Sequence, residues 1–295
     1  MSMTENSAEV RVLGKIISGG LHAFWTHTPP FRGKERLFRF VETRLGNPLM
    51  TIRSRDGWMA VRREGEWIEK EIWNTGEYEP EVWDALQAHA AGNEILWDVG
   101  ANVGSVAIQG LRDERVSEVH CFEPNPTVLR RLRRNLGLNR GRSYVHEVAL
   151  SDREGELVFH LGPESNIASL SWEWGQENIR VKCSTIDDVV SSRQAPPPTL
   201  MKIDVEGVED EVLRGAATLL ATRPPKAIAF EGHCDRAGAM VNATLAEALE
   251  GYGYAISHID RPSGVMSEWR GQLLANFIAV LERAREDRDL TRATR

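Results

Sequence analysis

The stretch ILWDVGANVGSVAIQG, from Ile95 to Gly110, decides the fold of this chain. It begins as an apolar run that reaches Asp98, breaks into glycines and an asparagine, and resumes with periodic apolar residues after Gly104. Such a run predicts a buried strand, a glycine turn and a helix. The composition of the turn raises the question of which ligand it serves.

Beyond this unit, apolar strands alternate with helical segments. This alternation predicts a doubly wound α/β fold, in which a mostly parallel sheet carries helices on both faces. Two later apolar runs, YGYAISHI and LLANFIAV, are expected to close the sheet as an edge hairpin. The predicted strands after the first are 116–124, 143–152, 199–207 and 226–233, and the predicted helices are 127–139, 184–192, 209–221 and one that begins at Pro80.

The sequence predicts one main domain with a smaller addition at its amino-terminal end. Residues 1–75 are expected to form an extension, with helical residues 34–45 and a small β element over 49–73. Residues 76–283 are expected to form the α/β domain, and residues 284–295 a charged tail that frays.

Composition narrows the classes of partner. The chain has 295 residues and a formal net charge of −7, so nucleic acid is not expected as the main partner. No membrane partner is expected either. The arginines between Arg130 and Arg134 are interpreted as the solvated face of an amphipathic helix. No apolar run approaches the length of a bilayer span, and the first residues do not resemble a signal peptide, so a cytoplasmic protein is expected. A homo-oligomer remains open, and Cys121, Cys183 and Cys234 are expected to be buried.

The glycine turn does not match the dinucleotide fingerprint. Counted from Gly100, Asn102 and Ser105 stand where that fingerprint has its second and third glycines. The turn therefore favours a ligand without a pyrophosphate. Glu123 ends the next strand, where a carboxylate can accept both hydroxyls of a ribose. The alternative is that Glu123 caps the helix that follows.

Several motifs resemble one known family. The chain is similar to the FkbM family of S-adenosylmethionine-dependent methyltransferases, a class I Rossmann-like type that often methylates hydroxyls of sugars and polyketides. The resemblance implies a sheet of seven strands with the last antiparallel, and S-adenosylmethionine as cofactor. It runs from Gly76 to His233 and rests on GEYEP, DVGANVG, FEPNP, ALSD, TIDDV, MKIDVEGVEDEVLRGA and FEGH.

The resemblance also implies a cofactor site. The methionine part of the cofactor would lie at the glycine turn, the ribose at Glu123 and the adenine near the ALSD motif. Two residues of GEYEP would cover the cofactor from the amino-terminal side. The residues implied are Asp98, Gly100, Asn102, Gly104, Glu123, Ala149, Leu150, Asp152, Tyr78 and Glu79.

An alcohol that accepts a methyl group needs a base, because it is a poor nucleophile until its proton is removed. We hypothesise that His233 or Asp204 is this base. In a strand, alternate side chains share a face, so Lys202, Asp204 and Glu206 are expected to point toward one cleft. Lys202, Glu206 and Glu231 are placed as orienting or substrate-binding groups. The alternative is a salt-bridged network around Lys202 that orders the end of the sheet.

Other acids are given structural roles. Glu209 and Asp210 are expected in the first turn of a helix, where acids suit the helix dipole. Asp187 and Asp188 are adjacent on a predicted helix and do not face one another, so a role at the helix start is preferred and no metal site is expected.

The insertion LGPESNIASLSWEWGQENIR, residues 161–180, is the predicted substrate-recognition element. Trp172 and Trp174 would stack on a sugar ring, while Asn166 and Ser169 would supply hydrogen bonds. The alternative is a local hydrophobic cluster that ties the insertion to the domain.

The function predicted is an S-adenosylmethionine-dependent O-methyltransferase that acts on a hydroxyl of a small sugar, glycosylated or polyketide-type molecule. One alternative is N-methylation of a macromolecule, but KIDVEG stands where such enzymes often carry an Asn/Asp-Pro-Pro-aromatic loop. A dehydrogenase is disfavoured by the missing glycines. A methyltransferase-like protein that binds without turnover is the third alternative, because a fold does not fix a function.

Overall fold

A computed structural model describes most of the α/β part of the chain. The described residues are 49–55, 57–63, 65–161, 177–235, 240, 243–260, 267–269 and 272–282, together with Arg36 and Phe40, which are helical. Within these residues, no helix combines the length and the apolar character needed to cross a membrane.

The main sheet has the strand order β11-β13-β10-β9-β3-β4-β5, and a short strand β12 also pairs with β13. Neighbours from β10 to β5 run parallel, whereas β13 is antiparallel to both β10 and β11. This order confirms the predicted doubly wound fold and the antiparallel last strand. The strands are β3 (Glu94–Val99), β4 (Val116–Phe122), β5 (Ser143–His146), β9 (Leu200–Ile203), β10 (Ala227–Cys234), β11 (Tyr254–His258), β12 (Ser267–Trp269) and β13 (Gln272–Leu281).

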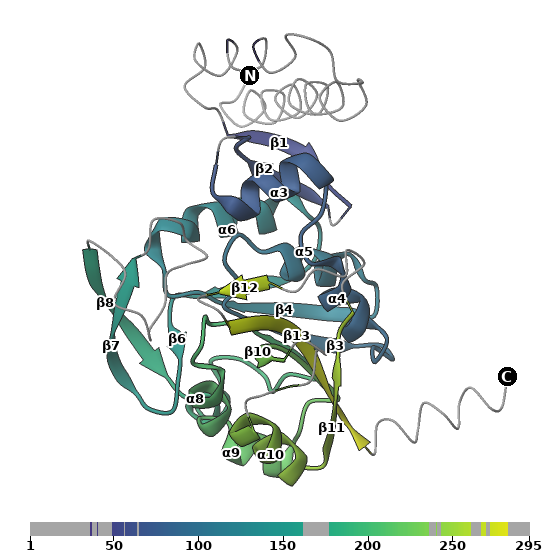
Figure 1. Cartoon of the computed structure of the whole chain (residues 1–295), viewed down its shortest axis with the longest axis vertical. Coiled ribbons are helices and arrows are strands. Elements are labelled where there is room, and N and C mark those ends of the chain that lie inside the picture. The colour runs from purple at the N-terminus through teal and green to yellow at the C-terminus, as the bar shows by residue number, and fades with distance from the viewer. Residues whose placement is uncertain are drawn as a thin grey trace, which may run out of the picture.

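Helices cover both faces of this sheet (Figure 1). One face carries α4 (Pro80–Gln87), α5 (Ser105–Arg112) and α6 (Pro126–Leu138), and the other carries α7 (Ile186–Ser191), α8 (Glu209–Arg214), α9 (Ala217–Thr222) and α10 (Ala243–Gly251). The chain moves outward from β3 to β5 in one direction and then from β9 in the other. The order of the sheet therefore reverses between β3 and β9, which is where doubly wound folds bind ligands.

The structure corrects several predicted elements. The predicted β element over 49–73 is a hairpin of β1 (Met50–Arg53) and β2 (Trp58–Val61) followed by a helix, α3 (Trp67–Thr75). The predicted strand 143–152 is two strands, because β6 (Ala149–Leu150) joins a separate sheet with β7 (Gly155–Leu161) and β8 (Glu177–Ser184). The predicted helix 209–221 is divided between α8 and α9.

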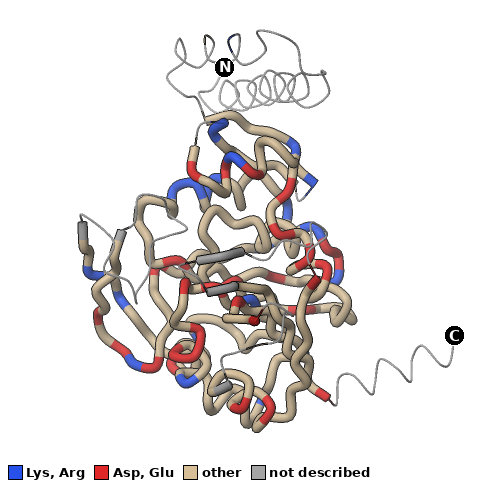
Figure 2. The backbone as a smooth tube through the Cα atoms, in the orientation of Figure 1, with Lys and Arg blue, Asp and Glu red and all other residues tan. Residues whose placement is uncertain are grey.

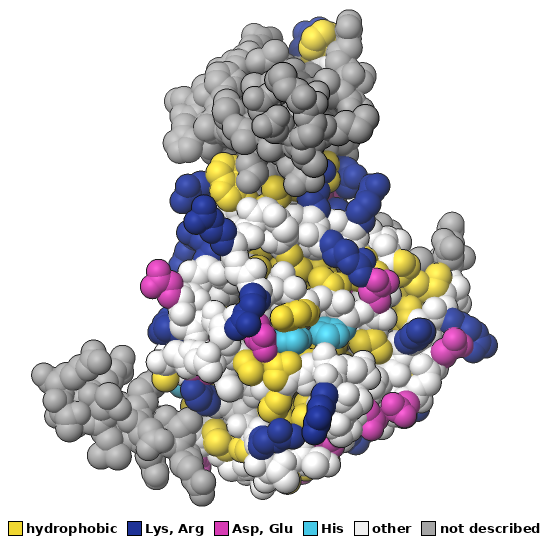
Figure 3. All heavy atoms as spheres, turned by 180° about the vertical axis from the view of Figure 1, so that it is seen from behind, with side chains coloured by type: hydrophobic (Ala, Val, Ile, Leu, Met, Phe, Trp, Pro, Cys, Tyr) yellow, Lys and Arg dark blue, Asp and Glu magenta, His cyan; other side chains and the backbone are white. Residues whose placement is uncertain are grey.

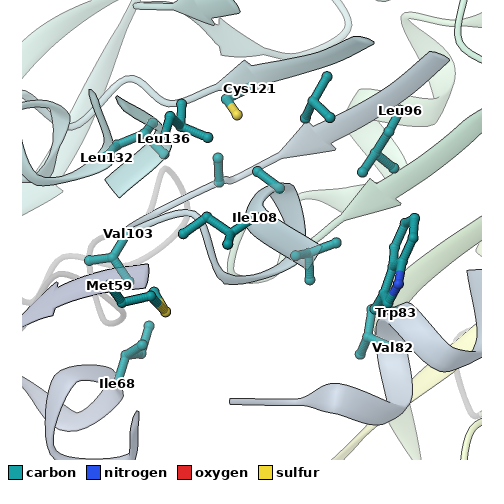
Figure 4. Packing of buried hydrophobic residues seen from close by; sticks show 14 of the residues in the cluster. Met59, Ile68, Val82, Trp83, Leu96, Val103, Ile108, Cys121, Leu132 and Leu136 are labelled. Carbon is teal, nitrogen blue, oxygen red and sulfur yellow. The ribbon is translucent and has the colours of Figure 1, made fainter. Parts of the chain in front are cut away.

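One hydrophobic core joins the hairpin, α3 and the sheet. Figure 4 shows Met59 of β2, Val103 of the glycine turn and Leu132 of α6 converging in it. The core is therefore continuous across residue 75, the predicted end of the extension. Arg131 also corrects the sequence interpretation: it is only 8% exposed and forms ion pairs with Glu66 and Glu69. The arginines of α6 are thus not all on its solvated face.

Asn135 of α6 and Asn139, the residue that follows this helix, hold the hairpin to the domain. The side-chain oxygen of Asn135 accepts a hydrogen bond from the Ala60 backbone N–H at 2.8 Å, and its Nδ2 donates to the Val103 carbonyl at 2.9 Å. Asn139 exchanges a similar pair of bonds with the backbone of Trp58. Because Val103 belongs to the glycine turn, the Asn135 amide connects that turn to β2.

We expect Asn135→Ala to lower the free energy of unfolding by about 2–4 kcal/mol, because it leaves a buried N–H and a buried carbonyl without partners. Urea denaturation followed by tryptophan fluorescence measures this change. The matched control is Arg134→Ala at the preceding, exposed position, for which we expect under about 0.5 kcal/mol. Equal stabilities for the two variants would contradict the assignment.

Candidate functional site

A pocket lies at the carboxyl ends of β3 and β9, where the strand order reverses. Its empty volume is about 890 Å³, including its opening to solvent. Residues of the glycine turn, the β4 and β9 ends, β6 and the segment before α4 line it. The predicted site residues among them are Tyr78, Glu79, Asp98, Gly100, Asn102, Glu123, Ala149, Leu150, Lys202, Asp204 and Glu206.

The glycine turn has the left-handed backbone that its composition predicts. The φ angles of Gly100, Asn102 and Gly104 are +74°, +47° and +90°. A Cβ at Gly100 would lie 1.8 Å from the carbonyl oxygen of Asp204, and one at Gly104 would lie 2.8 Å from Cδ1 of Leu132. Gly100 is thus required by packing against the Asp204 backbone, while at Gly104 the left-handed φ and the neighbouring Leu132 both favour glycine.

Lys202 ties the ends of β3 and β9 together. Its Nζ donates to the carbonyl of Gly100 at 2.8 Å and lies 3.1 Å from Oδ2 of Asp204 and 3.6 Å from Oδ1 of Asp98. Although burial alone would lower the pKa of Lys202, the two carboxylates raise it above its usual value. The ammonium therefore stays charged and holds both loops in place.

Asp98 is held by one hydrogen bond and one ion pair. Its Oδ2 accepts a hydrogen bond from the Ala107 backbone N–H at 3.0 Å, in the first turn of α5. Its buried Oδ1 is paired with the Lys202 ammonium at 3.6 Å and accepts no hydrogen bond from the described residues. Burial raises the pKa of this carboxyl, and Lys202 opposes that rise. An oxygen at the pocket wall that accepts no hydrogen bond is suited to a donor group on a ligand.

Glu123 projects into the same pocket from the end of β4. Its two oxygens accept backbone N–H groups of Asn102 and Asn125, each at 2.8 Å. Each carboxylate oxygen can accept more than one hydrogen bond, so acceptor capacity remains. Burial raises the pKa of Glu123 to about 7. The alternative role as a helix cap is not the one seen, because the side chain of Asn125 caps α6.

Several acidic side chains lie close together next to Lys202, and we call them the acidic wall. It consists of Glu79, Asp204, Glu206 and Glu231, whose charges all act on the half-buried Tyr78. Burial raises the pKa values of Glu206 and Glu231 well above the usual range, and the nearby charge of Asp204 adds to the rise. The wall therefore gathers several carboxyl groups beside the pocket, each able to accept hydrogen bonds.

The geometry of this wall differs from the prediction in one respect. Strand β9 ends at Ile203, so Asp204 and Glu206 lie in the loop after it rather than alternating with Lys202 along a strand. Glu206 has a left-handed φ of +59°, and Glu209 accepts the backbone N–H groups of Val205 and Gly207. The loop, ordered by Glu209, brings the acids to the pocket.

Not every predicted site residue lines the pocket. Gly104 begins α5 and packs on α6, while Asp152 forms ion pairs with Arg153 and Arg214. Glu231 and His233 lie on β10, beside the lining residues rather than among them. The remaining predicted substrate residues, Asn166, Ser169, Trp172 and Trp174, lie outside the described residues.

The acids interpreted as structural have helix-related contacts. Asp187 accepts the backbone N–H groups of Thr218 and Leu219 and so caps α9 rather than its own helix. Thr185 caps α7 through Asp188. The three cysteines are free and buried, as predicted.

The pocket also has apolar walls that the sequence motifs did not identify. Phe159 of β7, Ile68 of α3 and Val205 of the β9 loop line it. Phe159 and Ile68 could not be identified from the sequence, because β7 and α3 were not predicted. Val205 stands inside the MKIDVEG motif, where its apolar character between two acids was the available signal.

Comparison with known proteins identifies the family. The family described as "Methyltransferase FkbM domain" matches residues 98–255, more than half of the chain. Hexuronic acid methyltransferase AglP from Haloferax volcanii is 32% identical over 155 residues, which cover 51% of this chain and 62% of that protein. 2-O-methyltransferase NoeI from Sinorhizobium fredii is 31% identical over 148 residues, 44% of this chain and 60% of that protein.

The chain is also similar to a third methyltransferase and, in fold, to a solved structure. 31-O-demethyl-FK506 methyltransferase FkbM from Streptomyces tacrolimicus is 26% identical over 194 residues, 55% of this chain and 73% of that protein. The chain thus spans under two thirds of the length of the first two relatives. Trm5b from Pyrococcus abyssi is similar with a TM-score of 0.45 and 10% identity, over 78% of this chain and 55% of that one. The fold assignment rests on the strand order of the sheet itself.

We expect Gly100→Ala to destabilise the protein much more than Gly76→Ala. Both glycines have a φ near +80°, but nothing lies within 4 Å of a Cβ at Gly76. The control therefore carries only the cost of the left-handed backbone, about 1–2 kcal/mol, whereas Gly100→Ala adds a clash with the Asp204 carbonyl. Urea denaturation of both variants compares them, and a Gly100→Ala variant as stable as Gly76→Ala would refute the packing role.

Proposed function

The chain belongs to the FkbM methyltransferase family, and we propose that it transfers the methyl group of S-adenosylmethionine to a hydroxyl of a small sugar-like or polyketide-like molecule. The observation that carries this proposal is the buried carboxylate of Glu123, which faces a pocket at the reversal point of the sheet with acceptor capacity to spare. A ribose presents two adjacent hydroxyl donors, and this carboxylate suits both.

The residues around the pocket fit such a cofactor. Glu123 would hold the ribose, Ala149 and Leu150 offer an apolar surface for the adenine, and Asp98, whose Oδ1 accepts no hydrogen bond from the described residues, would bind the amino-acid part. Tyr78 and Glu79 would cover it from the segment before α4. When bound, the cofactor supplies an electrophilic methyl carbon on a sulfonium.

We assign the role of base to His233 rather than to Asp204. The Asp204 carboxylate is engaged by Lys202 at 3.1 Å, so it serves to position that ammonium. The Nδ1 atom of His233 is buried and has no hydrogen-bond partner among the described residues, so in the tautomer that carries its proton on Nε2 this atom would be free to accept a proton. Register places His233 on the same face of β10 as Glu231.

Surface charge supports a small-molecule acceptor. Figure 2 shows acidic and basic residues interspersed along the described chain. On the face in Figure 3, Lys and Arg side chains form separate groups divided by neutral surface. Proteins that bind nucleic acid usually present a basic stripe instead. A cytoplasmic location, the lack of nucleic-acid and membrane partners, and the oligomeric state remain predictions from the sequence.

The experiment that tests the cofactor class is calorimetry of S-adenosylhomocysteine binding at several pH values. Below pH 7 Glu123 holds a proton, and a protonated carboxyl has fewer acceptor sites for the ribose. We therefore expect binding to tighten about three- to tenfold from pH 6 to pH 8, levelling off above pH 7. Glu123→Gln should bind more weakly and lose this pH dependence.

Glu209→Gln is the matched control for that experiment. Glu209 is also buried, its pKa is also raised to about 7, and it also accepts backbone N–H groups, but it does not line the pocket. The variant should keep the pH dependence of the wild type. Absence of binding heat with both S-adenosylmethionine and S-adenosylhomocysteine on folded protein would overturn the proposed function.

Turnover tests the assignment of the base. A screen of deoxysugars and hydroxylated macrocycles with labelled methyl donor supplies an acceptor. We then expect His233→Ala to lower kcat by about 10²–10⁴ while the affinity for S-adenosylhomocysteine stays unchanged. Asp204→Asn should weaken cofactor affinity as well, because it releases Lys202. If His233→Ala keeps wild-type kcat and Asp204→Asn abolishes it with cofactor affinity intact, the roles are reversed.

A further inference from the structure

Strands β10 and β13 present a polar patch beside the acidic wall. In the antiparallel register, Glu231 of β10 lies opposite Asn276 of β13. Residues opposite one another share a face of the sheet, and Glu231, His233 and Lys202 share that face through the β10–β9 register. The side chain of Asn276 is therefore on the same face of the main sheet as that of Lys202.

Asn276 has a buried side-chain amide whose N–H groups are unpaired within the described residues. It is only 6% exposed, and its Nδ2 has no hydrogen-bond partner among the described residues. Its backbone carbonyl is already occupied by the N–H of Ile259. An amide donor left unpaired in this way costs about 1–3 kcal/mol, so an unpaired one on the sheet face that carries the pocket residue Lys202 points to a ligand.

The charge around Asn276 restricts what that ligand can be. The charged groups that act most on the neighbouring Glu231 are Asp204, Glu206, Glu79 and Glu209, all of them acids. Lys202, a cation on this face, is already paired with Asp98 and Asp204, so a carboxylate on the ligand would meet these acids without a counter-charge. A hydroxyl group can donate to Glu231 and accept from Nδ2 of Asn276 at the same time, so one hydroxyl satisfies both side chains.

We propose that Glu231 and Asn276 form a subsite that binds a second hydroxyl of the acceptor, and that the acceptor is a polyhydroxylated molecule without an acidic group. This inference rests on the proposed function and specifies its substrate class. Asn276 is a specificity residue, whereas His233, on the same face, acts on the hydroxyl that receives the methyl group.

The test uses the full chain saturated with S-adenosylhomocysteine, whose binding is measured first. If S-adenosylhomocysteine does not bind, the proposed function is refuted together with the subsite. The probes are methyl glycosides of glucose, galactose, mannose, fucose and rhamnose, and the methyl glycosides of glucuronic and galacturonic acid. Saturation-transfer NMR and calorimetry compare each neutral sugar with its acid.

We expect at least one neutral glycoside to bind about tenfold more tightly than the acidic glycosides. Asn276→Leu and the isosteric Asn276→Asp should weaken that binding about tenfold while S-adenosylhomocysteine affinity stays within about twofold. The second variant preserves the size of the side chain, and unchanged cofactor affinity in either variant shows that the fold survives. Glu231→Gln should narrow the ratio between neutral and acidic sugars.

Three results would overturn the inference. One is tighter binding of a uronic acid glycoside than of its neutral counterpart. Another is unchanged sugar affinity in both Asn276 variants. The third is no binding of any neutral glycoside to wild-type protein that holds S-adenosylhomocysteine, which would leave the cofactor assignment standing and remove the polyol subsite.

Discussion

The buried ammonium of Lys202 is the interaction on which the site depends. It joins the carbonyl of Gly100 after β3 to the carboxylate of Asp204 after β9, across the point where the strand order reverses. The same two loops meet so closely that no side chain fits at Gly100. Without the ammonium, Asp98 and Asp204 would be left as uncompensated carboxylates in a buried setting, which is costly. The charge pair and the glycine therefore enforce one geometry together.

Around this fixed point the pocket has two walls with different chemistry. The wall at β4 and β6 combines Glu123 with an apolar surface, which suits a nucleoside. On the side toward β10 and β13 the pocket is lined by Asp204 and Glu206, and Glu231 with Asn276 opposite it, which suit hydroxyl groups, lie next to these acids. The base proposed, His233, lies on the same face of β10 as Glu231. A methyl donor on one side and an alcohol on the other would meet near Lys202. Holding two reactants in line in this way supplies much of the rate enhancement that such a site can give.

The unit around Asp98 could be predicted from the sequence, whereas the end of β9, helix α3 and the position of Asn276 could not. The strand, turn and helix around Asp98 could be predicted because burial, glycine content and apolar periodicity agree there. The extent of β9 could not, because Asp204 and Glu206 continue the strand pattern of the sequence, whereas the chain leaves the strand after Ile203 and takes a left-handed φ at Glu206. Helix α3 was hidden because its apolar residues are interleaved with acids that pair with Arg131, a contact between distant parts of the chain. Asn276 carries no motif, so only the register of β13 against β10 reveals it.

A crystal structure of the full chain with S-adenosylhomocysteine tests the central claim most directly. We expect both ribose hydroxyls within hydrogen-bond distance, about 2.5–3.0 Å, of the Glu123 carboxylate, with the sulfur beside the loops that Lys202 joins. A nucleoside bound away from the reversal point, or one whose ribose faces away from Glu123, would contradict this claim.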